Sequence, residues 1–173
     1  MKLLLSEPEI HEAVRKVAAD LNRDLSMHRP VLVCVLKGAF LFFADLVREL
    51  EFPFDVEFVR AASYGTGTQS NGAVQLVIPP QLDLAGRHVV VVEDLVDSGY
   101  TLKALKRAIE ELKPASVRIA ALLDKEGRRE VDVPVDFVGV RKQCGFVVGY
   151  GTDCAERYRG LPAMFELEPN DLR

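Results

Sequence analysis

The sequence alternates short, continuous apolar runs with segments whose apolar residues recur at helical spacing. Residues 31–36 read Val-Leu-Val-Cys-Val-Leu, and residues 88–92 read His-Val-Val-Val-Val. Runs without polar alternation are typical of strands that are buried on both faces of a parallel sheet. Because such a sheet needs helices over both of its faces, this feature predicts an α/β fold.

The segments around these runs predict helices and further strands. Ser6 and Glu9 have the spacing of a capping box, and Ile10 begins a series of apolar residues at helical spacing. Residues 39–50 and 102–112 are also expected to be helical. Further strands are expected at residues 54–60, 117–122 and 137–140. Strands and helices in alternation predict a mainly parallel sheet flanked by helices.

Size and composition indicate one domain. The chain has 173 residues, of which 49% are hydrophobic, so residues 1–173 can bury one sizeable core. No run approaches the ~18 apolar residues of a membrane span, and the short leucine run near the N-terminus is no signal peptide. We therefore expect no membrane partner.

Charge and cysteine content limit the function classes further. The formal net charge of −4 has the wrong sign for a protein that binds the nucleic-acid backbone, so no nucleic-acid partner is expected. Cys34, Cys144 and Cys154 form no CxxC pair, which argues against a disulfide framework and a zinc site. A cytoplasmic protein is the simplest interpretation.

The strongest candidate site is the acid-rich turn at residues 93–101, Glu-Asp-Leu-Val-Asp-Ser-Gly-Tyr-Thr. It follows the second apolar run and leads into a predicted helix, and such strand-to-helix turns bind ligands in open parallel sheets. The N–H groups at the helix start favour an anion, so residues 97–101 are expected to hold a phosphate. Ser98 and Thr101 would add hydroxyls, and Gly99 would let the backbone approach. The structural alternative is that Asp97 or Ser98 merely caps the helix.

Other features of the sequence carry weaker signals. Residues 61–81 form a glycine- and hydroxyl-rich stretch that is either a functional lid or a solvated hairpin tip. The Gly65-Thr66-Gly67 segment lacks the third glycine of a dinucleotide fingerprint, and no Walker motif is present. Three histidines are expected to be surface or packing residues: His11, His28 and His88.

Residues 93–101 resemble the phosphoribosyl-pyrophosphate motif of the type I phosphoribosyltransferases. A narrower resemblance, to the hypoxanthine-guanine phosphoribosyltransferases, covers most of the chain and rests on residues 35–40, 63–65, 136–153 and 156–162. It implies the type I fold, with a small hood and a flexible lid loop. It also implies transfer of ribose 5-phosphate to hypoxanthine or guanine, with release of pyrophosphate and with Mg²⁺ as cofactor.

The resemblance assigns a role to each candidate residue. Asp97 would be the general base that takes the purine ring proton, and Glu93 and Asp94 would bind the ribose hydroxyls. The 5-phosphate would lie on Asp97, Ser98, Gly99, Tyr100 and Thr101. Pyrophosphate would be held by Lys37 and Gly38, at a non-proline cis peptide before the lysine, and by Arg159.

The same resemblance places the base, the metal and the lid. The base would be bound by Lys125, Phe146, Val147 and Asp153. The metal would be held by Asp153, with Glu93 and Asp94, and the lid would contain Ser63 and Tyr64. Taken singly, Phe146 could be plain core, Lys125 a solvated turn charge and Arg159 the partner of a surface acid.

One segment departs from the family pattern and leaves alternatives open. The family usually has an aromatic residue and an Ile-Pro pair where residues 140–145 read Val-Arg-Lys-Gln-Cys-Gly, which leaves the choice among hypoxanthine, guanine and xanthine open. A regulator with this fold that binds RNA is the alternative from another class. By resemblance the protein is expected to be a homodimer or homotetramer, with residues 40–43 in the interface or in the core.

Overall fold

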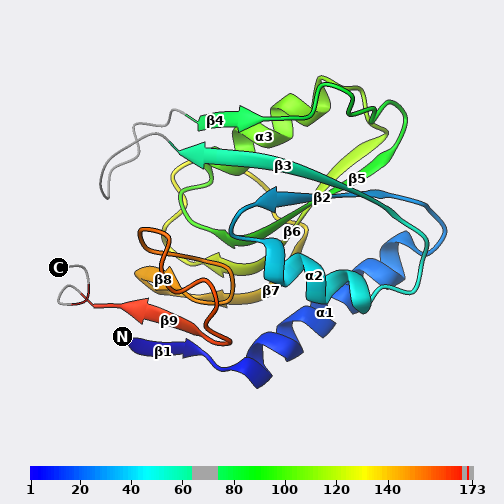
Figure 1. Ribbon diagram of the computed structural model, residues 1–173. Helices are drawn as coiled ribbons and strands as arrows, with labels where there is room; N and C mark the ends of the chain where they lie inside the picture. The colour runs from blue at the N-terminus through cyan, green and yellow to red at the C-terminus, as the bar shows by residue number, and fades with distance from the viewer. Residues whose placement is uncertain (64–73, 169–170, 172–173) are drawn as a thin grey trace.

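The computed structural model describes residues 1–63, 74–168 and 171. Its centre is a six-stranded sheet with the strand order β4-β3-β2-β5-β6-β7 (Figure 1). All neighbouring pairs are parallel except β3 and β4. This confirms the predicted α/β fold with a mainly parallel sheet. The strands are β2 (Val31–Leu36), β3 (Asp55–Ser63), β4 (Val74–Val77), β5 (His88–Val96), β6 (Ser116–Lys125) and β7 (Phe137–Lys142).

Helices cover both faces of this sheet. The helices α1 (Glu7–Leu25) and α2 (Phe40–Arg48) lie on one face, and α3 (Tyr100–Glu110) lies on the other (Figure 1). The predicted capping box starts α1, because the Glu9 carboxylate accepts the Ser6 N–H at 2.7 Å. The three predicted helices are therefore confirmed.

The continuous apolar runs serve two cores at once. In β2, Leu32 faces the core under α1 and α2, while Val33 faces the core under α3. In β5, Val90 faces the core under α1 and α2, and Val91 faces the core under α3. Because side chains alternate across a strand, a strand between two cores must be apolar at every position.

A second, antiparallel sheet forms a small hood beside the first. Its strands are β1 (Lys2–Leu5), β8 (Phe146–Val148) and β9 (Met164–Leu167), in the order β1-β9-β8. The sheet brings the two ends of the described chain side by side (Figure 1). These strands have three or four residues each, too few to show a period, so only the family resemblance predicted a hood.

The second apolar run continues further than its sequence suggested. We expected β5 to end at Val92, with the acids after the strand, but Glu93 still pairs with Ala121 and the strand continues to Val96. The expected end was therefore wrong. Glu93 and Asp94 are buried inside a strand, 7% and 8% exposed, which is unusual for charged side chains and indicates a functional position.

Candidate active site

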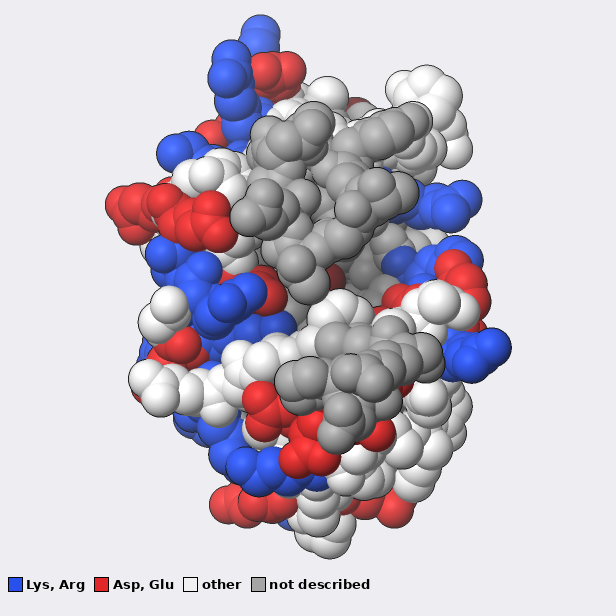
Figure 2. Space-filling view, turned by 90° about the vertical axis from the view of Figure 1, so that its left-hand side faces the viewer, with Lys and Arg blue, Asp and Glu red and all other residues white. Residues whose placement is uncertain are grey.

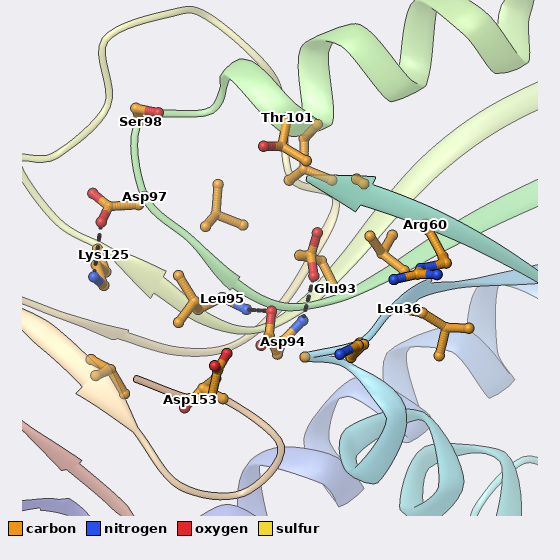
Figure 3. Close-up of a pocket in the computed structure, with 18 of the residues that line it drawn as sticks. Leu36, Arg60, Glu93, Asp94, Leu95, Asp97, Ser98, Thr101, Lys125 and Asp153 are labelled. Carbon is orange, nitrogen blue, oxygen red and sulfur yellow. Dashed lines mark hydrogen bonds and ion pairs between the residues drawn. The ribbon is translucent and has the colours of Figure 1, made fainter. Parts of the chain in front are cut away.

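A cavity of about 720 Å³ opens at the carboxyl ends of the central parallel strands. One wall comes from the ends of β2, β5 and β6, and the other comes from β8 of the hood and residues 152–159. Figure 3 shows Asp97 and Lys125 on one side of the cavity, Leu36 and Arg60 on the other, and Glu93 and Asp94 between them. Open α/β sheets bind their ligands at this edge.

Most of the predicted site residues line this one cavity. It contains Lys37, Gly38, Glu93, Asp94, Asp97, Ser98, Gly99, Thr101, Lys125, Phe146, Val147, Asp153 and Arg159. Tyr100 begins α3 and is not among the lining residues. Ser63 is the last residue of β3, and Tyr64 lies outside the described residues, so the predicted lid stays a prediction.

The start of α3 is open to an anion. The residue at the cap position is Gly99, in the left-handed conformation with φ of 92°, and no side chain caps the helix. The alternative that Asp97 or Ser98 serves only as a helix cap is therefore wrong. A Cβ on Gly99 would lie 3.0 Å from Arg129 Cδ, so glycine suits both the conformation and the space. The first-turn N–H groups have the positive potential that phosphate groups favour.

Two buried acids form the floor of the cavity. Asp94 N–H donates to Glu93 Oε1 at 3.1 Å, and Leu95 N–H donates to Asp94 Oδ1 at 2.8 Å (Figure 3). Burial, together with the Asp94 charge, raises the pKa of Glu93, and burial also raises the pKa of Asp94. A Cβ on Gly38 would overlap the Asp94 carboxylate, so this side of the floor has no room for a side chain.

Asp97 forms the centre of an ion-pair network. Its carboxylate accepts Lys125 Nζ at 2.9 Å and Arg128 Nε at 3.1 Å. Burial would raise the pKa of Asp97, but the hydrogen bonds and charges of Lys125 and Arg128 outweigh it and hold the pKa below its usual range. The carboxylate is thus ionised at neutral pH and can accept a proton from a ligand.

Two further cations of the cavity wall, Lys37 and Arg159, pair with Glu156. Lys37 Nζ lies 2.7 Å from Glu156 Oε1, and Arg159 NH2 lies 2.8 Å from Asp153 Oδ1 and 3.2 Å from Glu156 Oε2. The Leu36–Lys37 peptide bond is cis, as the family resemblance predicted. Lys37 and Arg159 therefore lie close together around one carboxylate. Two such cationic donors can also bind the oxygens of a phosphate group.

The structure tests the purely structural interpretations of Lys125, Phe146 and Arg159. Lys125 is only 5% exposed, so it is not a solvated turn charge, and Phe146 is 42% exposed at the cavity, so it is not plain core. Arg159 does pair with acids, as its alternative proposed, but it does so in the cavity wall.

Two charged residues of the cavity were missed by the sequence reasoning. Arg60 lies beside Leu36 in the register of β3 with β2, so its position at a predicted strand end was the available signal. Glu156 lies within the segment 156–162 that carried the resemblance, but it was given no role. The three histidines lie outside the cavity, and the rings of His28 and His88 contact each other at a tilt of 51°, with centroids 4.2 Å apart.

The cavity contains the ligand chemistry that a magnesium ion prefers. Glu93, Asp94 and Asp153 supply carboxylate oxygens, and within the described ranges no Lys or Arg side chain forms an ion pair with the buried Glu93 or Asp94. No group of three His, Cys, Asp or Glu side chains in the described ranges is close enough to form a metal cage. The three carboxylates that were predicted to hold the metal therefore do not form a cage by themselves. Mg²⁺ commonly keeps waters and uses few protein ligands.

Comparison with known proteins agrees with this geometry. The family model described as the phosphoribosyl transferase domain matches residues 2–154. The chain belongs to the phosphoribosyl transferase family. A hypoxanthine phosphoribosyltransferase of Haemophilus influenzae is 40% identical to it over 92% of this chain and 90% of the relative. A hypoxanthine-guanine phosphoribosyltransferase of Bacillus subtilis is 39% identical over 97% of this chain and 93% of the relative.

Solved structures of phosphoribosyltransferases show the same fold. A crystal structure of a hypoxanthine-guanine phosphoribosyltransferase from Bacillus anthracis has a TM-score of 0.90 and 39% identity, and the match covers 97% of this chain and 99% of that one. That structure holds a HEPES molecule in its active site. These proteins are enzymes, and they lend no support to a regulator that binds RNA.

The face of this phosphoribosyltransferase that Figure 2 shows carries charges of both signs and gives no support there to an RNA-binding role. On the face shown in Figure 2, Lys and Arg side chains are interspersed with Asp and Glu side chains. A nucleic-acid site requires a continuous basic stripe or patch. Within the described part of the chain, no helix is long and apolar enough to cross a membrane.

Proposed function

We propose that this protein transfers ribose 5-phosphate from phosphoribosyl pyrophosphate to hypoxanthine or guanine and releases pyrophosphate. The single observation that carries the proposal is the make-up of the cavity. The cavity is lined by the start of α3, which no side chain caps, and by the exposed ring of Phe146. It is also lined by the ionised Asp97, which pairs with the buried Lys125. The helix start suits a phosphate, and the aromatic ring suits a stacked base. Asp97 can accept a proton from the base, and Lys125 can donate to its carbonyl oxygen.

Asp97 and Lys125 would act on the purine. Asp97 would accept the ring proton that the purine loses as its nitrogen bonds to the sugar. Lys125 would donate to the 6-oxo group, and Phe146 would stack on the ring. Adenine has an amino group in place of the 6-oxo group, so its N–H donors would face the N–H donors of Lys125. The pair therefore favours 6-oxopurines over adenine.

Lys37 and Arg159 would act on the leaving group. The transition state for this transfer places positive charge on the sugar and negative charge on pyrophosphate. Two cationic side chains at the same end of the cavity would stabilise the departing pyrophosphate. Glu93 and Asp94 would accept hydrogen bonds from the ribose hydroxyls and stabilise the cationic sugar.

We also propose Mg²⁺ as the cofactor, with Asp153 and the pair Glu93 and Asp94 as the protein oxygens nearest to it. When bound, the ion would neutralise charge on the pyrophosphate oxygens. The burial of Glu93 and Asp94 supports the proposal, since burial raises the pKa of both carboxyl groups and a cation beside them would stabilise their charged forms.

We further propose that the protein forms a homodimer or homotetramer and works in the cytoplasm. Phe40 and Phe58 are 40% and 47% exposed, and a second copy would remove this apolar surface from water. The cysteines Cys34, Cys144 and Cys154 are all free, which suits a reducing compartment. Light scattering during size-exclusion chromatography would measure the oligomeric state.

The test of the function is pyrophosphate release from phosphoribosyl pyrophosphate and Mg²⁺ with each of five bases: hypoxanthine, guanine, xanthine, adenine and uracil. Turnover is expected with hypoxanthine or guanine. Asp97→Asn should lower kcat about 10²- to 10⁴-fold because the general base is lost. The exposed Asp132→Asn is the matched control and should keep full activity. Turnover with xanthine alone, or with no base, would contradict the proposal.

A further inference from the structure

The segment that departs from the family pattern is held in place from outside the cavity. Gly145 lies directly before the base-facing Phe146, and its N–H donates to Glu166 Oε1 at 2.5 Å. Glu166 lies in β9, in the hood, and does not line the cavity. A hydrogen bond to an ionised carboxylate is shorter and stronger than one between neutral groups. Glu166 therefore fixes the orientation of a peptide group that borders the base site.

The other side of Gly145 contacts the proposed 6-oxo donor. The Gly145 carbonyl oxygen accepts Lys125 Nζ at 2.8 Å, while Asp97 Oδ2 accepts the same ammonium group at 2.9 Å. An ammonium group has three donors, so these two contacts leave one N–H for a ligand. The direction of that third donor is set by the two acceptors. The position of the Gly145 carbonyl thus decides where Lys125 points.

Gly145 itself cannot provide this rigidity. Glycine has the most backbone freedom of any residue, and Gly145 lies outside the hydrogen-bonded ladder of β8 and β9. A Cβ at this position would come within 2.9 Å of Glu166 Oε1. Gly145 and Glu166 are therefore matched to each other, because a side chain at 145 would push the carboxylate away from the N–H that it holds.

We propose that Glu166 is a positioning residue for the purine: it holds the Gly145 peptide and so aims the ammonium group of Lys125 at the 6-oxo group. The inference rests on the proposed function, since it assigns Lys125 to the base. It predicts that Glu166 acts on purine binding and has no effect on the phosphate end of the cavity. Glu166 touches no substrate in this arrangement.

The test compares Glu166→Met, which removes the acceptor, with Glu166→Gln, which keeps a side-chain oxygen for the Gly145 N–H. The Met variant should raise the KM for hypoxanthine and guanine about five- to tenfold, the upper range for the loss of one hydrogen bond at a solvent-exposed position. Its KM for phosphoribosyl pyrophosphate should stay unchanged. The Gln variant should restore the purine KM to within about twofold of the unmodified protein.

Two further variants separate positioning from a general structural effect. Glu168→Met removes the acid of an exposed residue directly after β9, and it should leave all kinetic constants unchanged. Gly145→Ala as a single substitution should raise the purine KM. In the Glu166→Met background it should raise this KM little further, because both changes break the same hydrogen bond.

Each result decides between the proposals. If Glu166→Met keeps the purine KM of the control while the unmodified protein is active, the inference is overturned and the function stands. If both KM values and the thermal midpoint change together and Gln restores none of them, Glu166 has a general structural role and the inference is again overturned. If the unmodified protein turns over no purine, the proposed function falls and this inference falls with it.

Discussion

Gly38 is the residue at which a single added carbon has the most direct effect on the site. Its backbone passes so close to Asp94 that any side chain would overlap the carboxylate. We predict that Gly38→Ala displaces Asp94, lowers kcat/KM for phosphoribosyl pyrophosphate and destabilises the fold by about 1–3 kcal/mol, the usual effect of overpacking. Steady-state kinetics and denaturant unfolding would measure both effects.

The control for this substitution is Gly160→Ala, because nothing lies within 4 Å of a Cβ at that position. It should change the free energy of unfolding little. Equal effects of the two substitutions would show that the loss at Gly38 does not come from Asp94.

Asp97 allows a prediction about pH at the same scale. Its pKa in the folded protein lies below that of an unfolded aspartate, so its contribution to stability is complete above the unfolded pKa and is lost as pH falls through the folded pKa. Replacing either cationic partner should raise this pKa. Lys125→Met should raise it more than Arg128→Gln, since Lys125 is buried and is the larger of the two causes. Carboxyl NMR titration of Asp97 would measure the shift, and a lower pKa in either variant would contradict the assignment.

At the scale of elements, the segment between β8 and β9 brings an acid to the two cations of the proposed pyrophosphate site. Glu156 pairs with both Lys37 and Arg159, so a pyrophosphate group would have to displace its carboxylate. We predict that Glu156→Gln lowers the KM for phosphoribosyl pyrophosphate about two- to fivefold, because ion pairs of exposed side chains contribute only about 0.2–1 kcal/mol. The Glu156 side chain is 65% exposed, which places it in that class.

Kinetics with phosphoribosyl pyrophosphate and inhibition by pyrophosphate would both measure this effect, and Glu168→Gln supplies a control of equal charge change. A rise in the KM of the Glu156 variant would mean that the carboxylate helps to hold the cations in place for the substrate.

The start of α3 is the second element with a direct consequence. Because Gly99 has a φ of 92°, alanine there would be strained in addition to its contact with Arg129 and Val133. Gly99→Ala should reduce phosphoribosyl pyrophosphate affinity and stability together. Isothermal titration and thermal unfolding would measure them. Gly86→Ala makes the same change at φ 69° in open space and should reduce stability alone.

At the scale of the whole molecule, the two cores share the central strands. Leu21 on α1 and Leu105 on α3 are both fully buried, but they lie on opposite faces of the sheet. Replacing either leucine by alanine should lower the free energy of unfolding by about 2–5 kcal/mol. Because β2 and β5 contribute side chains to both cores, we predict one cooperative transition in each variant, as expected for a single domain. Two separate transitions by circular dichroism and fluorescence would contradict this.

The sequence alone determined the alternation of strands and helices, the parallel sheet and the acid-rich turn, because these depend on local periods and on one short segment. The family resemblance added Lys37, Lys125 and Arg159, whose distant positions carry no local signal. Only the tertiary structure decided that β5 continues through its two acids, that Glu156 lies between the cations and that Glu166 holds Gly145. The contacts of Glu156 with Lys37 and of Glu166 with Gly145 join residues that are distant in the chain, and they depend on how the hood packs beside the central sheet rather than on any local pattern.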